Sequence, residues 1–262
     1  MTALAGLPPD VLAAFLPHVT TLLIIFARVG AVTMLLPAFS DDAIPGRIRL
    51  LFGVGLAIGL SGLLGPSVRT ITASVGLPIA IIVAEIMIGL AIGMIVRMMF
   101  QAAAMAGAIT SMQIGLSSAL VFDPAQSGQT PILSRFAATA AAVVCLALDI
   151  HHLWITAIIA SYRAFPIGAL PDADGFATLA LMAAGQATML AISLAAPMIL
   201  YGILFNVALG LGARMAPALQ VFFIAQPLNI LLGLTLFATT MGTMLTVFTD
   251  TMAAFLRQVG WH

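Results

Sequence analysis

Charged side chains are scarce in this sequence: only 7% of its 262 residues are charged, whereas 62% are hydrophobic. Soluble domains average about 25% charged and about 45 to 50% apolar residues. Nine basic and nine acidic side chains are too few to keep a protein of 27.1 kDa in water, where about a quarter to a third of surface positions carry charge. Much of the surface is therefore expected to face lipid or other protein subunits.

Lysine is absent and cysteine nearly so. All nine basic residues are arginine and nine acids balance them, so no basic excess predicts nucleic-acid binding. The single Cys145 excludes an intrachain disulfide and a cysteine-pair zinc or redox site, and it is expected to be a small buried hydrophobe. Met1–Asp10 contains no basic residue, so the first apolar segment is expected to be retained rather than cleaved as a signal peptide.

Long apolar runs fill most of the chain. A membrane-spanning helix needs about 20 mainly apolar residues, and the candidates are residues 11–39, 50–64, 77–100, 102–122, 136–161, 176–213 and 218–249. The last two runs contain Pro197 and Pro227 and are too long for one straight span, so each is expected to be kinked or to form two pieces. No linker divides the chain. The sequence predicts an all-α, membrane-associated bundle of kinked helical hairpins, with one domain over residues 1–262.

Four charged residues fall inside these apolar runs: Arg28, Glu85, Arg97 and Asp149. Charge at membrane depth is costly, so each is a candidate for a buried functional group, or for one that pairs with a partner. Glu85 and Arg97 cannot pair within one helix, because twelve residues of helix separate them by about 18 Å.

Small residues recur at a spacing of four. Gly89 and Gly93 share the helix face of Glu85, and Gly55 and Gly59 repeat the pattern in the preceding apolar run. Small residues at this spacing allow helices to approach closely, so the pattern predicts tight helix packing.

Two enzyme interpretations can be considered from the residues. A serine protease would use Ser117 with His151 or His152 as its base, but the sequence around Ser117 falls short of the GxSxG motif. A metal site on the adjacent histidines is disfavoured, because neighbouring residues on a helix point about 100° apart. No HExxH, phosphate-binding loop or dinucleotide motif is present. We therefore expect no enzyme activity, catalytic residue, cofactor or metal.

Three groups of short segments share their order and spacing with one protein family. They are RVG at 28–30, PAF at 37–39 and IPGRIR at 44–49; QIGLS at 113–117, FDP at 122–124 and PILSR at 131–135; and NVALGL at 206–211, RMAP at 214–217 and QPL at 226–228. Taken together, they resemble the FliR family of flagellar type III export gate subunits, which includes the T subunits of virulence secretion systems. The resemblance covers nearly the whole chain.

The resemblance implies a structural role in protein export. FliR-like chains join FliP-like and FliQ-like subunits in a helically arranged, hetero-oligomeric gate at the entrance of the export channel, with FlhB-like and FlhA-like proteins beside it. Unfolded flagellar proteins pass through this channel. The implied location is the bacterial inner membrane, as a multi-pass protein of the flagellar basal body.

The resemblance also assigns the central segment to a plug that closes the channel. The residues implied are Gln113, Gly115, Leu116, Ser117, Ser118, Leu120, Phe122, Asp123 and Pro124. Irregular backbone rich in Gly and Ser is tolerated at membrane depth only inside protein or beside a water-filled cavity, which agrees with this role. Close relatives often carry an aromatic residue at the position of Ser118, so the bulk is expected from Leu116, Leu120 or Phe122. The ordinary alternative is a surface connector between two helices.

Two further expectations remain. A buried structural turn is expected at Arg214, Met215, Ala216 and Pro217. The alternative function is a stand-alone secondary transporter or channel, in which Glu85 and Asp149 would form a midplane site between helices broken at the two internal prolines.

Overall fold

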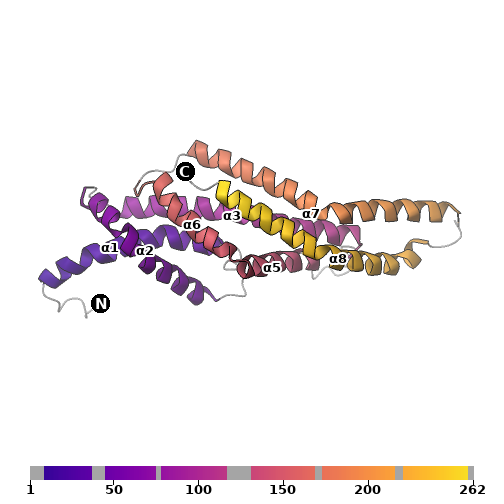
Figure 1. Ribbon diagram of the computed structural model, residues 1–262, viewed down its shortest axis with the longest axis horizontal. Helices are drawn as coiled ribbons and strands as arrows, with labels where there is room; N and C mark the ends of the chain where they lie inside the picture. Colours follow the sequence, from indigo (N-terminus) through magenta and orange to yellow (C-terminus); the bar gives the residue numbers. More distant parts are fainter. Residues whose placement is uncertain are drawn as a thin grey trace. The chain divides into compact units, whose positions relative to one another are not determined.

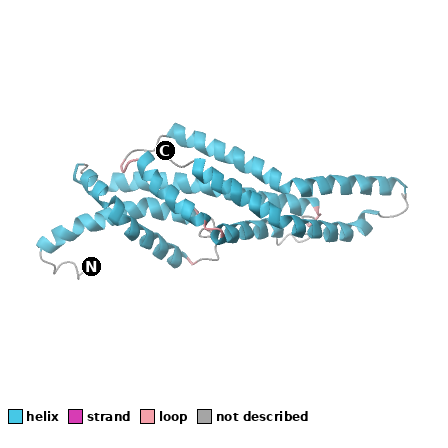
Figure 2. Cartoon of the chain, viewed as in Figure 1, coloured by secondary structure: helices cyan, strands magenta, loops and turns pink. Residues whose placement is uncertain are grey.

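The computed structural model describes residues 9–36, 45–74, 78–116, 131–168, 173–215 and 221–258, and these are almost entirely helical (Figures 1 and 2). The helices are α1 (Pro9–Leu35), α2 (Gly46–Ser74), α3 (Pro78–Gln113), α5 (Ile132–Ala147), α6 (Ile150–Ala164), α7 (Ala173–Met215) and α8 (Val221–Gln258). No strand occurs in these ranges, so the all-α prediction is confirmed.

Among the described residues, five helices are long and apolar enough to cross a membrane: α1, α2, α3, α7 and α8. The pair α5 and α6, bent by 80°, makes a sixth crossing if it forms one broken span. A helix rises about 1.5 Å per residue and the hydrocarbon layer is about 30 Å thick. The 36 residues of α3 and the 43 residues of α7 are thus more than one straight crossing needs.

Helix α3 differs from the prediction, which placed two spans at 77–100 and 102–122. It is one helix from Pro78 to Gln113. Gln101 is exposed while Ala102 and Ala103 beside it are buried, and both residue types favour helix. The predicted division was wrong because a polar residue on the outer face of a helix does not end it.

The predicted span 136–161 is interrupted after Leu148. Asp149 has a φ of 59°, a left-handed conformation that Asp adopts more readily than most residues. Helix α5 therefore ends at Ala147, and α6 starts in a new direction at Ile150. Asp149 is exposed at this break, so the chain itself does not bury it.

Helices α7 and α8 continue through Pro197 and Pro227, so the two-piece alternative is wrong for both. A proline inside a helix removes one hydrogen bond and crowds the preceding turn, which bends a helix without ending it when the flanking residues remain helical. Figure 1 shows α7 changing direction along its length.

Helix α7 also extends into the segment predicted as a buried turn. Arg214 and Met215 are its last two residues, and both are exposed, with 87% exposure for Met215. These two residues therefore continue the helix and are not buried by the chain itself, and burial of the turn stays a prediction. Ala216 and Pro217 lie outside the described residues.

The chain divides into two compact units. Unit 1 comprises residues 1–97, 154–182 and 259–262, and unit 2 comprises residues 98–153 and 183–258. In unit 1, α1 packs against α2. In unit 2, α3 and α5 each contact α8 through aromatic rings, in the pairs Phe100–Phe248 and Phe136–Phe237. Cys145 is buried in unit 2. The single domain over residues 1–262 stays a prediction.

Candidate functional site: a buried charge cluster and the end of helix α3

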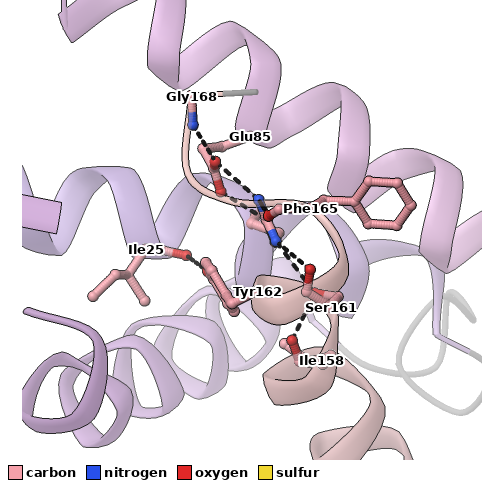
Figure 3. A network of polar contacts seen from close by, with 8 residues as sticks. Ile25, Glu85, Ile158, Ser161, Tyr162, Phe165 and Gly168 are labelled. Carbon is pink, nitrogen blue, oxygen red and sulfur yellow. Dashed lines mark hydrogen bonds and ion pairs between the residues drawn. The ribbon is translucent and has the colours of Figure 1, made fainter. Parts of the chain in front are cut away.

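Arg28 on α1 and Glu85 on α3 form a buried ion pair in unit 1 (Figure 3). The Arg28 Nε donates to Glu85 Oε2 at 2.7 Å, and Nη2 donates to Oε1 at 2.9 Å. Both side chains are fully buried. Two parallel hydrogen bonds between a guanidinium and a carboxylate fix both groups in one geometry. The pair therefore sets the register of α1 against α3.

The remaining donors of Arg28 bind the end of α6. Nη1 donates to the Ser161 carbonyl at 3.1 Å and to the Ser161 hydroxyl at 3.4 Å, and Nη2 donates to the Phe165 carbonyl at 2.9 Å. These bonds and the two to Glu85 engage all five N–H groups of a guanidinium. A cation at the C-terminal end of a helix also lies at the negative end of the helix dipole. One side chain thus joins α1, α3 and α6.

Tyr162 and Gly168 complete the cluster. The Arg28 Cζ lies 4.0 Å from the centroid of the Tyr162 ring, a cation–π contact, and the Tyr162 hydroxyl donates to the Ile25 carbonyl at 3.4 Å. The Gly168 N–H donates to Glu85 Oε1 at 3.3 Å. Desolvating an ion pair is costly unless its remaining polar atoms are hydrogen-bonded, and here they are. Glu85 is the cluster's one carboxylate, whereas a proton relay needs successive acids, so the arrangement favours a structural role.

Gly89 and Gly93 explain how α1 and α3 approach closely enough for this pairing. A Cβ atom on Gly89 would lie 2.5 Å from the Arg28 carbonyl oxygen, and one on Gly93 would lie 2.8 Å from the Leu35 Cβ. No side chain fits at such distances without moving a helix. Around Gly55 and Gly59, by contrast, a Cβ would meet nothing within 4 Å among the described residues.

The structure brings together two of the four predicted charges. Arg28 and Glu85 were selected separately, and their pairing was missed because 57 residues separate them and helix register is not visible in a sequence. The available signal was the one Arg of the run 11–39 and the one Glu of the run 77–100. Arg97 and Asp149 are exposed, so the chain itself does not bury them, and their pairing with a partner stays a prediction.

Helix α3 ends where the predicted plug begins. The N–H groups of Ile114 and Gly115 donate to the carbonyls of Thr110 and Met112 at 3.1 and 3.2 Å. Gly115 has a φ of 79°, and glycine in this conformation commonly terminates a helix. A Cβ at Gly115 would also collide with the Gln226 side chain. The backbone conformation therefore favours glycine here, and a larger residue would also displace the Gln226 side chain.

Side chains from α7 and α8 hold this end of α3 within unit 2. Asn229 Nδ2 donates to the Gln113 carbonyl at 3.4 Å, and Gln226 Nε2 donates to the Gly115 carbonyl at 3.5 Å. The Tyr201 hydroxyl in turn donates to Asn229 Oδ1 at 2.8 Å. The last carbonyls of a helix have no partner within the helix, so these amides serve as its cap.

Close packing reinforces the anchor. Ile114 is fully buried, and Gly233 on α8 leaves room for it, because a Cβ on Gly233 would collide with the Ile114 side chain. Gly202 on α7 similarly leaves room for Gln113. Tyr201 and Asn229 were not predicted as site residues, since both lie inside long apolar runs that indicate only membrane spans.

Three of the predicted plug residues can be placed. Gln113, Gly115 and Leu116 are half-buried at the end of α3. The others lie outside the described residues: Ser117, Ser118, Leu120, Phe122, Asp123 and Pro124. The proposed protease serine is therefore among those without a described position.

Asp149, His151 and His152 gather at the break between α5 and α6. Asp149 Oδ1 lies 3.9 Å from His151 Nε2 and 3.8 Å from His152 Nδ1, and the three potential ligand atoms lie within 4.8 Å of one another. This cluster was not predicted, because on an unbroken helix the adjacent histidines point apart. Ligand atoms around zinc lie about 3.4 Å apart, given bonds of about 2.1 Å in a tetrahedron. This spacing is wider, and we assign no metal to it.

The chain matches the family described as bacterial export proteins, family 1, over residues 19–255. It is 38% identical to the flagellar biosynthetic protein FliR of Caulobacter vibrioides over 90% of this chain and 94% of the relative. It is 35% identical to the FliR of Escherichia coli K12, over 82% and 81% of the two chains, and 29% identical to that of Bacillus subtilis, over 79% and 81%.

These matches confirm the resemblance that the sequence motifs indicated. They leave no place for the serine protease interpretation, since the family consists of export proteins and not of enzymes. Its candidate spans make the chain a multi-pass membrane protein. With most of its length matched, this protein belongs to the bacterial export proteins of family 1, alongside the flagellar FliR proteins.

Proposed function

We propose that this chain is a structural subunit of the flagellar type III export gate, where it lines the export channel and carries part of its closure. Family membership supplies the export context. The observation that supports closure is the anchored end of α3, where α8 side chains bind the carbonyls of Gln113 and Gly115. This anchor provides a fixed base for the segment that we propose as the plug.

The anchor suits a segment that must sometimes move. Its hydrogen bonds join neutral amides, hydroxyls and carbonyls, and each such bond contributes about 0.5–1.5 kcal/mol. The proposed plug, residues 113–124, contains one charged residue, Asp123. A passing substrate would therefore displace it without breaking a strong ion pair. In this proposal Leu116, Leu120 and Phe122 supply bulk, Ser117 and Ser118 allow irregular backbone, and Asp123 and Pro124 shape the loop.

The proposed partners are FliP-like and FliQ-like subunits, with FlhB-like and FlhA-like proteins beside them, in the inner membrane at the flagellar basal body. Exposed apolar surfaces on the chain support the presence of partner subunits. Only 17% of the residues in an apolar 18-residue stretch of α8 are buried, and only 22% in that of α2. Large exposed side chains lie along α7 and α8, among them Leu200, Leu204, Leu211, Leu228 and Leu231. Contiguous apolar surface of this kind marks contact with lipid or protein. Unfolded flagellar proteins are the proposed cargo.

The alternative of a stand-alone transporter is not favoured. Glu85 is fully occupied by Arg28 and the Gly168 N–H, and Asp149 is exposed at a helix break. Neither acid is free at a buried site for a transported ion.

Deleting Gly115 to Ser118 tests the proposal. We expect the gate to assemble, as measured by co-purification of partner subunits with the tagged chain, and the cells to lose membrane potential, as measured with a voltage-sensitive dye. A deletion of equal length at 40–43, between α1 and α2, is the control and should leave the potential unchanged in assembled complexes. An assembled 115–118 deletion that holds a normal potential contradicts the closure role.

A further inference from the structure

A groove of about 710 Å³ lies between α7 and α8 in unit 2. It is lined on α7 by Gly185, Met189 and Ser193, and on α8 by Asp250, Ala254 and Gln258. Each set repeats every four residues and so forms one face of its helix. The groove therefore runs along both helices for at least about 12 Å. Its small residues, Gly185, Ser193 and Ala254, permit close approach by a third helix.

Asp250 is the charged residue in the lining of this groove. It is exposed, and no other described residue forms an ion pair or hydrogen bond with its carboxylate. It also lies inside a candidate membrane span, Ile224–Gln258. A carboxylate at such a position is costly unless a cation or a hydrogen-bond donor reaches it.

The apolar run predicted from the sequence ends at Thr249, with Asp250 just beyond it. Helix α8 instead continues to Gln258, so more than two turns of helix follow Asp250. The chain's nearest cation along this helix is Arg257. Seven residues separate the two, which is about 10 Å of rise and too far for a direct ion pair.

We propose that the groove receives a helix of a separate membrane subunit, and that a lysine or arginine on that helix pairs with Asp250. The inference rests on the proposed function, which places the chain in a gate of several subunits. In addition to Asp250, the lining of the groove includes the hydroxyls of Ser193 and Thr251 and the amides of Gln186 and Gln258. Their oxygens accept the further hydrogen bonds that an ammonium or guanidinium group needs.

Charge selects this occupant over two others. Lipid acyl chains would leave the carboxylate unpaired in an apolar medium. A second copy of this chain, docked symmetrically, would bring a second Asp250 to the same groove. A basic partner helix satisfies the carboxylate and covers the apolar lining, including Met189, which is 69% exposed, and Val247, which is 42% exposed.

Charge reversal at Asp250 tests the proposal in cells that co-express the full chain with the other gate subunits. The readout is the fraction of membrane-inserted, tagged chain that co-purifies with those subunits, so a variant that fails to insert is recognised separately. Asp250→Lys should lower this fraction about tenfold or more, because it places two cations together where a pair was buried. Asp250→Asn keeps the shape and should cause a smaller loss. Asp149→Asn, at another exposed acid of unit 2 outside the groove, should stay within about twofold of wild type.

The second arm identifies the occupant. Each intramembrane Lys or Arg of the partner subunits is changed in turn to Asp, and one of these changes should restore assembly of Asp250→Lys. Three results overturn the proposal. The first is Asp250→Lys assembling like wild type, and the second is rescue only by a change in a second copy of this chain. The third is a wild-type chain that, in membranes lacking amine-bearing lipids, loses as much assembly as Asp250→Lys does. This arm measures assembly and the 115–118 deletion measures ion leak, so either idea can fail while the other stands.

Discussion

Arg28 in unit 1 and Asp250 in unit 2 are both charges within helices of an apolar chain, but their surroundings are opposite. Arg28 is fully buried, and its five N–H groups bind Glu85, Ser161 and Phe165. Asp250 is exposed in a groove, with no ion-pair or hydrogen-bond partner in the part of the chain that is described. The first charge is satisfied by its own chain and stabilises the fold. The second is left for another molecule, which is what distinguishes an assembly surface from a core.

The helices themselves show the same difference. In α1 and α3, which carry the Arg28–Glu85 pair, 50% of the residues in an apolar 18-residue stretch are buried within the chain. In the corresponding stretch of α8, which carries Asp250, 17% are buried. Since burial of apolar area contributes about 25 cal/mol per Å², α8 depends far more than α1 on lipid or partners for its stability. The comparison predicts that substitutions in the cluster damage the chain itself.

The largest effect is expected at Arg28. Arg28→Met leaves Glu85 buried without its cation, and breaking a buried pair in this way costs about 3–5 kcal/mol. The measurement is the resistance of the purified complex to thermal unfolding, together with the amount of chain inserted in the membrane. The double variant Arg28→Met with Glu85→Leu should recover most of the loss, because no charge then remains buried. A single variant as stable as wild type contradicts the role of the cluster.

A smaller effect is expected from crowding the contact between α1 and α3. Gly89→Ala puts a Cβ 2.5 Å from the Arg28 carbonyl oxygen and should cost about 1–3 kcal/mol by forcing the helices apart. The matched control is Gly59→Ala, where the added Cβ meets no described residue within 4 Å, and it should be neutral or stabilising by about 0.5–1 kcal/mol. Equal thermal stability of the two variants would show that the close approach is unimportant.

In unit 2, the anchored end of α3 is held by hydrogen bonds between neutral groups, which are weaker than the ion pair of the cluster in unit 1. Asn229→Leu removes the amide that links Tyr201 to the Gln113 carbonyl and should cost about 1 kcal/mol of stability. Its main consequence should be a raised ion leak through assembled complexes. Asn206→Leu is the control, since Asn206 is exposed and, among the described residues, its side chain bonds only to the Gly202 carbonyl of its own helix. An equal ion leak through complexes of the two variants would show that Asn229 does not contribute to closing the channel.

The smallest effect is expected at Ser161. Ser161→Ala removes the 3.4 Å contact with Arg28 Nη1 but keeps the backbone carbonyl that the same group binds at 3.1 Å. We expect a loss of about 0.5 kcal/mol, near the lower limit for a hydrogen bond. A loss as large as that of Arg28→Met in the same unfolding measurement would mean that the Ser161 hydroxyl, and not the carbonyls of Ser161 and Phe165, is the main contact of Arg28 with the end of α6.

The fold was largely predictable because its signal is local. Apolar runs of this length specify helices and membrane spans without knowledge of their neighbours. Helix ends were less predictable: α3 passes Gln101 and α8 passes Asp250, because a polar side chain on an outer helix face costs the helix little. The break at Asp149 was missed for the converse reason, since a single residue with positive φ leaves no periodic trace.

The sites were predictable only in part. Gln113 and Gly115 were identified through resemblance, and Arg28 and Glu85 through the cost of charge in an apolar run. The contacts between them were not, because the Arg28–Glu85 pair and the Asn229–Gln113 bond join residues 57 and 116 positions apart. Such pairings depend on which helix faces meet, and the apolar pattern of these helices, nearly uniform around the axis, does not specify a face.

Electrical recording is the most direct test of our proposal that the segment after α3 closes the export channel. The purified, assembled gate is placed in a planar bilayer, and the current through wild type is compared with that through the complex deleted at Gly115 to Ser118. We expect the wild-type complex to pass almost no ions and the deleted complex to show a steady conductance. Equal currents through the two assembled complexes, whether closed or open, would contradict the proposal.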